Sequence, residues 1–342
     1  MDSHKVLVTG AAGYIGSHAV VELLEANYEV VAVDNLANSE PSAIENISKI
    51  TGKKFPFIEA DTCDTDALKR VFEKHDFDSV IHFAAYKAVG ESVENPLKYY
   101  SNNLQSFVNV LSLMREFKRS NVIFSSSATV YGNADKLPVT EQTPLKPASS
   151  AYGRTKQICE DILIDSVKAY DNFNGIILRY FNPVGAHPSA LIGELPRGVP
   201  NNLVPFITQT AAGIRPCLKV FGNDYNTPDG TCVRDFIDVV DLARAHVCAL
   251  ERLLAYKTKQ NYDIYNIGTG KGVSVQELLD TFERVNNLKL NYVYAPRRSG
   301  DVPEIWSNAS KANKELGWYA KTPLAETLKN AWQWQKNISS IK

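Results

Sequence analysis

The sequence predicts an α/β protein, built on a doubly wound parallel sheet and completed by a smaller, mixed α/β region toward the carboxyl end. The first half alternates short β-branched runs with amphipathic stretches, which is typical of a parallel sheet with helices on both faces. After Phe181, the chain becomes rich in Gly, Pro and Asn as far as Pro228, and this change indicates a second, less regular region. At 342 residues, with 44% hydrophobic and 22% charged residues, the chain can form one large domain or two smaller ones.

Six strands are expected in the first half, each a short apolar run: Lys5–Thr9, Glu29–Val33, Phe55–Glu59, Ser79–His82, Val122–Ser125 and Gly175–Arg179. Helices are expected where apolar residues recur at helical spacing: Tyr14–Ala26, Thr65–His75 and Pro96–Phe117. Further along, Asp235–Leu254 has the pattern of a helix and Tyr262–Ile267 that of a strand. We therefore expect residues 1–180 to form a first domain, to which the chain returns around residues 235–267, and residues 181–342 to form a second.

The third of these helices carries an apolar stripe with two interpretations. Leu104, Phe107, Val108 and Leu111 can pack on the sheet alone, or this long helix can also pair with a second subunit. A homodimer is therefore an expectation that the sequence leaves open.

Composition excludes several classes of partner. A formal charge of −1 provides no global field toward nucleic acid or an anionic membrane. The five cysteines are scattered, with no CxxC pair and no His/Cys cluster at metal spacing, so we expect no disulfide framework, no metal site and five buried thiols. No apolar run is long enough to span a bilayer, and the first residues lack the layout of a signal peptide. These features favour the cytoplasm.

A glycine-rich turn follows the first strand. Gly10, Gly13 and Gly16 form a GxxGxxG pattern between a strand and a helix, the context of a Rossmann-type dinucleotide fold. Gly10 permits a tight turn, and Gly13 lets the backbone approach a pyrophosphate at the positive end of the helix. Small residues also let any helix pack closely on a strand, so the glycines alone are weak evidence.

Acidic residues after the next two strands strengthen this interpretation. Asp34 ends the second strand, eighteen residues after Gly16, where a carboxylate can accept hydrogen bonds from adenosine ribose hydroxyls. A carboxylate there repels a 2′-phosphate, so the sequence favours NAD over NADP. Asp61, just beyond the third strand, is either an adenine contact or a surface aspartate.

Tyr152 and Lys156 are four residues apart at the start of a predicted helix, so both side chains project from one face. An ammonium ~4 Å from a phenol contributes roughly 4 kcal/mol at an effective dielectric of ~20, enough to lower the phenol pKa by about three units. Such a tyrosinate can remove a hydroxyl proton while the adjacent carbon gives a hydride to NAD. A YxxxK spacing also arises by chance on helices.

Hydroxyl residues at the end of the fifth strand favour the catalytic interpretation. Ser125, Ser126 and Ser127 lie at the edge where open α/β sheets bind ligands. We assign to Ser127 a hydrogen bond to the reacting oxygen; the alternative is that these hydroxyls satisfy the loop backbone.

Ten segments carry a family resemblance: TGAAGYIGSH (Thr9–His18), VDNL (Val33–Leu36), HFAAYKAVGESV (His82–Val93), FSSSATVYG (Phe124–Gly132), YGRTK (Tyr152–Lys156), RYFNPVGAHPS (Arg179–Ser189), VPNNL (Val199–Leu203), FGNDY (Phe221–Tyr225), RDFIDVVDLA (Arg234–Ala243) and APRRSGD (Ala295–Asp301). On these segments the chain resembles the extended short-chain dehydrogenase/reductase family, and within it the UDP-glucose 4-epimerases, over nearly its full length. Several of the segments are specific to the hexose epimerases.

The resemblance implies a site for each ligand. It implies that NAD is held by Gly10, Gly13, Tyr14, Ile15, Gly16, Asp34, Asn35, Asp61, Thr62, Phe83, Ala84, Lys87, Asn102, Lys156 and Tyr180. It implies that the UDP-sugar is held by Ser127, Tyr152, Asn182, Asn202, Leu203, Phe221, Arg234, Arg298, Asp301 and Ile305. Forked arginine cations suit a diphosphate, and an aspartate can accept from a ribose. The first domain is then the NAD-binding domain and the second the UDP-sugar-binding domain.

The implied activity is interconversion of UDP-glucose and UDP-galactose through a 4-keto sugar, with Tyr152, Lys156 and Ser127 as catalytic residues. A nucleotide-sugar 4,6-dehydratase is one alternative, but relatives of that kind carry an Asp-Glu pair after the strand-five hydroxyls, where this chain has Ala128 and Thr129. A non-catalytic NAD-binding regulator is another, but such proteins typically lack the Tyr and Lys.

One position departs from the family pattern. The resemblance places Tyr there in enzymes confined to plain hexoses and Cys in those that also accept N-acetylated sugars, whereas this chain has Ile305. Ile is smaller than Tyr and larger than Cys, so we hypothesise partial activity on UDP-GlcNAc and UDP-GalNAc.

Overall fold

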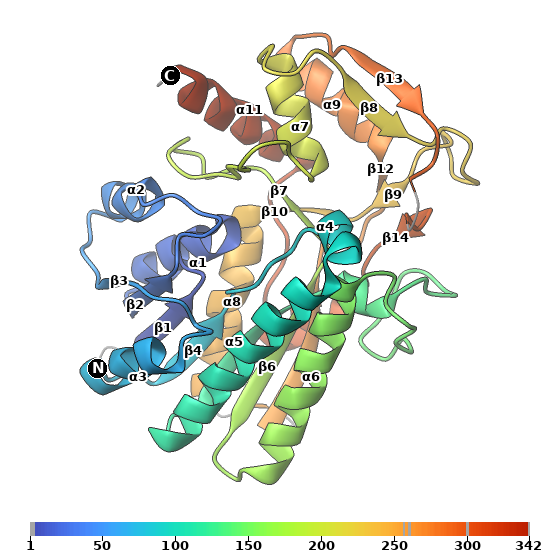
Figure 1. The fold of residues 1–342 in the computed structure, drawn as a ribbon. Helices are drawn as coiled ribbons and strands as arrows, with labels where there is room; N and C mark the ends of the chain where they lie inside the picture. The colour runs from blue at the N-terminus through green and yellow to red at the C-terminus, as the bar shows by residue number, and fades with distance from the viewer. Residues whose placement is uncertain (1–3, 256, 259–260, 299–300, 341–342) are drawn as a thin grey trace.

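The computed structural model describes residues 4–255, 257–258, 261–298 and 301–340. Its centre is a parallel sheet in the order β11-β6-β5-β4-β1-β2-β3 (Figure 1). The strands are β1 (Lys5–Thr9), β2 (Glu29–Asp34), β3 (Phe57–Glu59), β4 (Ser79–His82), β5 (Asn121–Ser127), β6 (Asn174–Tyr180) and β11 (Tyr262–Ile267). Every neighbouring pair in this sheet is parallel. The predicted α/β fold with a doubly wound parallel sheet is confirmed.

Helices cover both faces of the sheet because alternate strand residues point to opposite faces. On one face, Val6 and Val8 pack with α1 (Tyr14–Glu25), α2 (Ser42–Thr51), α8 (Val239–Leu254) and α10 (Ser310–Leu316). On the other face, Leu7 packs with α3 (Thr65–Lys74), α5 (Pro96–Glu116) and α6 (Ala151–Ala169). The two helical layers therefore have separate apolar cores, divided by the sheet. The short helices α4 (Val89–Glu94) and η1 (Ala128–Tyr131) follow the ends of β4 and β5.

A second region lies above the carboxyl ends of the strands in Figure 1. Its core joins α7 (Leu203–Ala211), α9 (Val275–Asn286) and α11 (Leu324–Ser340) to the parallel pair β8 (Leu218–Phe221) and β13 (Tyr292–Ala295). Short strands connect it to the sheet: β7 (Asn182–Val184) pairs with β10 (Phe236–Asp238), and β9 (Val233–Arg234) lies between β12 (Val273–Ser274) and β14 (Glu304–Ile305). The carboxyl ends of the sheet strands thus face this second region.

Most element boundaries agree with the sequence, and two differ from it. The helix expected from Asp235 begins at Val239, because residues 236–238 form a strand beside β7. Asp238 then caps the helix, its carboxylate accepting the amides of Val240 at 2.8 Å and Asp241 at 3.4 Å. β3 also begins two residues later than expected, at Phe57. Strand β11 matches the expected range and pairs with β6, whereas the division into two domains at residue 180 stays a prediction.

One expectation about side-chain burial needs correction. Only Cys159 and Cys232 are buried; the thiols of Cys63, Cys217 and Cys248 are partly exposed, and all five are free. The stripe on α5 divides as well, because Phe107 is fully buried while Val108 is 39% exposed. The core interpretation therefore holds for Phe107, whereas pairing with a second subunit stays a prediction. In the described part of the chain, no helix has the length and apolar character needed to cross a membrane.

Candidate active site

The glycine turn at the end of β1 depends on close backbone contacts. Gly10 has φ +70°, and a Cβ on it would lie 2.8 Å from the amide nitrogen of Ala84. A Cβ on Gly16 would lie 2.1 Å from the carbonyl oxygen of Gly10, so this glycine lets α1 pack onto the turn. Gly10 therefore serves backbone conformation and Gly16 serves helix packing.

The first turn of α1 presents free donors. Gly13 precedes the helix without a side-chain cap, and the first amide that donates to a backbone carbonyl within it is that of Ser17, to Gly13 at 2.9 Å. Among the described residues, the amides of Tyr14, Ile15 and Gly16 donate to no protein group. Unpaired amides at the positive end of a helix suit an anion such as a pyrophosphate. This local structure fits a dinucleotide.

Asp34 has a structural role that the sequence does not reveal. One oxygen of its carboxylate accepts the amide of Ala12 at 2.9 Å, and the other accepts the amide of Leu36 and the hydroxyl of Ser39, both at 2.8 Å. Because a carboxylate has about four acceptor positions, capacity for a ribose hydroxyl is left. Asp34 therefore anchors the glycine turn to the end of β2 as well as bordering the expected ribose site.

Asn35 and Asp61 meet beside it, the Asn35 amide donating to Asp61 at 3.1 Å. The remaining residues assigned to NAD lie at the same ends of the strands: Phe83 and Ala84 follow β4, Thr62 follows β3, Asn102 accepts from the Cys63 thiol, and Tyr180 contacts Ser125. The structure thus brings the predicted cofactor residues together at the ends of five strands.

Glu194 joins the two predicted ligand sites, and the sequence analysis missed it. The Lys87 ammonium lies 2.8 Å from its carboxylate, and the Asn202 amide donates to the same oxygen at 2.6 Å. Lys87 is assigned to NAD and Asn202 to the UDP-sugar. A lone Glu in a Gly- and Pro-rich segment carries no sequence signal for such a role.

The predicted catalytic residues converge where α6 begins against the end of β5. Ser150 caps this helix by accepting the Gly153 amide at 3.1 Å, which places Tyr152 and Lys156 in its first two turns. The Lys156 ammonium donates to the Ser125 carbonyl at 2.6 Å and lies 5.9 Å from the centre of the Tyr152 ring. Ser127 hydrogen-bonds Tyr152 and also accepts the Thr129 hydroxyl at 3.0 Å.

The charge states of this pair differ from the expectation. Burial raises the pKa of Tyr152 to about 12, and the hydrogen bond with Ser127 acts in the opposite direction. Burial lowers the pKa of Lys156 to about 8. The expected direct lowering of the phenol pKa by Lys156 is wrong for the chain by itself, because desolvation dominates both groups. The positive charge of an oxidised nicotinamide beside the phenol would favour the tyrosinate.

Apart from Ser127 and Tyr152, the residues assigned to the UDP-sugar lie on the short strands, helices and loops of the second region. Phe221 ends β8 with 40% of its surface exposed, and the Arg298 guanidinium lies 5.8 Å over its ring. Arg298 also pairs with Asp301 at 2.8 Å; Ser299 and Gly300 of this segment lie outside the described residues. Arg234 on β9 opposes Ile305 on β14. The others precede or begin elements of this region: Asn182 at β7, and Asn202 and Leu203 at α7.

Comparison with known proteins agrees with this geometry. A family model described as GDP-mannose 4,6 dehydratase matches residues 7–331. The UDP-glucose 4-epimerase of Dictyostelium discoideum is 51% identical over 331 residues, covering 97% of this chain and 95% of that protein. The chain belongs to the UDP-glucose 4-epimerase family.

Solved structures of the family have the same fold. The UDP-glucose 4-epimerase of Bifidobacterium longum, in complex with NAD+ and UDP, has a TM-score of 0.94 and 44% identity, covering 97% of this chain and 98% of that one. That of Stenotrophomonas maltophila, with NAD and formylated UDP-arabinopyranose, has a TM-score of 0.96 and 45% identity, covering 99% and 100%.

Within this family fold, Asp235 is a second residue that the sequence analysis did not single out. Its fully buried carboxylate accepts five hydrogen bonds: from the amide and hydroxyl of Thr269, the amide of Gly270, and the amide and hydroxyl of Ser307. Its carbonyl accepts the amide of Asn182 at 3.0 Å. Asp235 therefore ties together β7, β9, the loop after β11 and the segment after β14.

The described residues contain no group of three or more His, Cys, Asp or Glu side chains placed to hold a metal ion. Tyr152, Lys156 and Ser127 give the site a buried phenol, a buried ammonium and a buried hydroxyl.

Replacing Asp235 with Asn should weaken substrate binding more than the chemical step. The amide has one acceptor oxygen instead of two, so one of the two loops loses its amide donor contact and Arg234 and Ile305 lose their fixed separation. We expect KM for a UDP-hexose to rise by about tenfold or more, with kcat changed less. Steady-state kinetics measure this split, with Asp229→Asn, on the neighbouring loop, as the matched control. An unchanged KM would contradict the assigned role.

Proposed function

We propose that this chain is an NAD-dependent isomerase that interconverts UDP-glucose and UDP-galactose by inverting the configuration at C4 of the sugar. One observation carries the proposal: Tyr152, Ser127 and Lys156 meet at the carboxyl end of β5, between a dinucleotide turn and a set of residues suited to UDP. The identity to curated members of the family supports the same conclusion.

The mechanism assigns each step to a residue of the chain. When bound, NAD supplies the acceptor for a hydride from C4 and, once reduced, the donor that returns it. Tyr152 takes the proton of the 4-hydroxyl, and Ser127 holds that oxygen by a hydrogen bond. Lys156 supplies positive charge behind the phenol. Arg234, with the other UDP contacts, retains the nucleotide while the 4-keto sugar turns and presents its opposite face. The C4–H bond is broken and re-formed, so no net oxidation occurs.

The dehydratase alternative lacks its acid and base. Elimination of water after oxidation needs a carboxylic acid and a carboxylate beside the sugar. Ala128 and Thr129 occupy the positions after the strand-five hydroxyls, and the Thr129 hydroxyl donates to Ser127 at 3.0 Å. The regulator alternative is disfavoured because Tyr152 and Lys156 are both present and buried at the site.

The decisive assay incubates the purified protein with UDP-galactose and no added NAD. We expect UDP-glucose to form, and Tyr152→Phe to reduce turnover by roughly 10²–10⁴-fold because it removes the proton acceptor. Bound NAD and the melting temperature should stay near wild type. Formation of a 4-keto-6-deoxy sugar, or substantial turnover by Tyr152→Phe, would show that the chemistry or its base is different.

We also propose partial activity on UDP-GlcNAc and UDP-GalNAc. Ile305 is 8% exposed and packs with Ala128, Tyr131 and Phe181. Ala128 is the residue that follows Ser127 at the end of β5. A branched aliphatic side chain at this position leaves more room than a phenol and less than a thiol.

Replacing Ile305 with Ala should therefore increase the ratio of kcat/KM for UDP-GlcNAc to that for UDP-glucose. A gain of about 10-fold corresponds to relief of roughly 1.4 kcal/mol of steric cost. Coupled product assays on both substrates measure the ratio, and Val302→Ala, on the same segment, is the matched control. If wild type and variant are equally inactive with UDP-GlcNAc while UDP-glucose is turned over, the tolerance hypothesis is wrong.

A homodimer through α5 is the proposed assembly. Leu97 at its start is 80% exposed and Val108, two turns from its end, is 39% exposed. Exposed apolar residues on one long helix suit a second copy of the same helix across a twofold axis. Sedimentation of the wild type should give the mass of a dimer, and Val108→Glu should shift it toward the monomer.

The cytoplasmic location stays a prediction from the sequence.

A further inference from the structure

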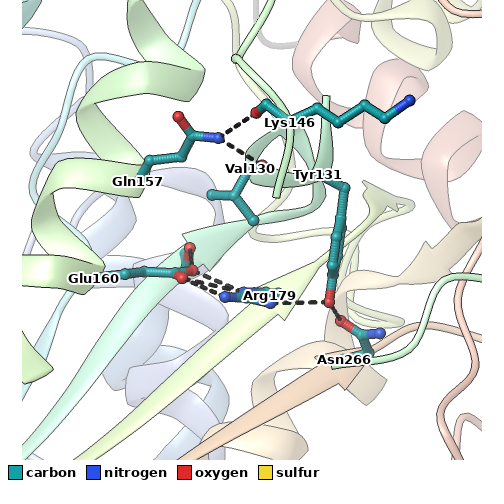
Figure 2. Close-up of polar contacts among 8 residues, drawn as sticks. Val130, Tyr131, Lys146, Gln157, Glu160, Arg179 and Asn266 are labelled. Atoms are coloured by element: carbon teal, nitrogen blue, oxygen red, sulfur yellow. Dashed lines mark hydrogen bonds and ion pairs between the residues drawn. The ribbon is translucent and has the colours of Figure 1, made fainter. Parts of the chain in front are cut away.

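A buried ion pair lies beneath the catalytic end of α6 (Figure 2). Glu160 is on α6, one helical turn after Lys156, and Arg179 is on β6. Nε of Arg179 lies 2.9 Å from one oxygen of Glu160, and Nη2 lies 2.5 Å from the other, so the contact is bidentate. The two side chains are only 4% and 2% exposed. Neither Glu160 nor Arg179 takes part in the proposed proton or hydride transfer.

Glu160 completes a set of three contacts between α6 and β5. The Ser125 carbonyl accepts from Lys156, the Ser126 hydroxyl donates to Glu160, and the Ser127 hydroxyl is bonded to Tyr152. Consecutive residues of the strand therefore each meet a different polar side chain of the helix. Because Ser126 also lies directly opposite Arg179 in the sheet, Glu160 contacts both β5 and β6 at the level of the site.

The other side of Arg179 leads away from the helix. Its Nη1 donates to the Tyr131 hydroxyl at 3.2 Å, and that hydroxyl donates to Asn266 on β11 at 2.6 Å. The side-chain amide of Asn266 donates to the carbonyl of Val139 at 3.0 Å. Figure 2 shows these side chains in one connected chain of polar contacts. The ion pair therefore links α6 to three strands of the sheet and to the segment after β5.

A second contact joins α6 to that segment. The Gln157 amide donates to the carbonyls of Val130 and Lys146, both at 2.7 Å (Figure 2). With Glu160, it limits rotation of the helix about its own axis and sliding along β5. Because Tyr152 and Lys156 extend from the first two turns of α6, any rotation or sliding of this helix would move both side chains.

Stability alone does not account for a buried ion pair. Replacing a buried ion pair with apolar side chains of similar size is often neutral or stabilising, whereas removing one partner is strongly destabilising. A buried pair at a catalytic helix therefore calls for an explanation from geometry.

We propose that Glu160 and Arg179 are a positioning pair, which holds α6 against β5 and β6 so that Tyr152 and Lys156 lie correctly against Ser127. This inference rests on the proposed function. The electrostatics agree: burial lowers the pKa of Lys156, and the neighbouring Cys159 and Glu160 act in the opposite direction, toward the ammonium form.

The test separates positioning from stability with a double variant. Glu160→Leu with Arg179→Met removes both charges and leaves no unpaired ion, so the melting temperature and bound NAD should stay near wild type. We expect kcat to fall by about tenfold or more while KM changes little, because the UDP contacts lie elsewhere. Arg252→Met is the control for a loss of stability without a change at the site. It removes the pairs with Asp263 at 3.0 Å and Glu315 at 3.1 Å, near the amino end of β11, and should lower stability with kcat unchanged.

Each outcome decides the proposal. A folded double variant with wild-type kcat would overturn it. If the double variant does not fold, Arg179→Lys decides, because it keeps the charge and removes the bidentate contact. A lower kcat with bound NAD retained supports the positioning role, and wild-type kcat rejects it. Wild-type protein that fails to convert UDP-galactose would instead reject the proposed function, whatever the variants do.

Discussion

The contact between helix α6 and the carboxyl end of strand β5 is the interaction on which the site depends. Tyr152 and Lys156 are carried by the helix and Ser127 by the strand, so their distances are set only by how these elements pack. The packing uses apolar contacts in the core of one face, with Cys159 and Leu163 buried against the sheet. Polar contacts from Lys156 and Glu160 then set the register that apolar packing alone leaves loose.

Burial at this contact has a cost. It raises the pKa of Tyr152 and lowers that of Lys156, so both shifts oppose the charged forms that proton removal requires. The chain offsets this with the Ser127 hydrogen bond, and a cationic nicotinamide would offset it further. A phenol with a high pKa in the chain alone and a lower one beside an oxidised cofactor would remove a proton only when oxidation can follow.

The second region has an apolar core, but its loops are held by carboxylate acceptors. Asp235 and Glu194 hold loops that arrive from distant parts of the sequence, and each contacts a residue assigned to UDP or NAD. Hydrogen bonds to a buried carboxylate are directional, so they can fix irregular backbone where helices and strands are short. This explains how a segment rich in Gly, Pro and Asn keeps a defined conformation.

The sequence by itself determined the sheet and most of its strands, because hydrophobic periodicity and the glycine turn are local signals. The Tyr152–Lys156 pair is also a local signal, because the two residues lie one helical turn apart. The residues of the two predicted ligand sites were implied mainly by the family resemblance. Only the tertiary structure decided the beginning of α8, where pairing with β7 overrides the helical pattern, and the roles of Asp34, Glu160, Glu194 and Asp235. Their partners lie far away in the chain, and burial, which decides the pKa of Tyr152, arises only when the elements pack together.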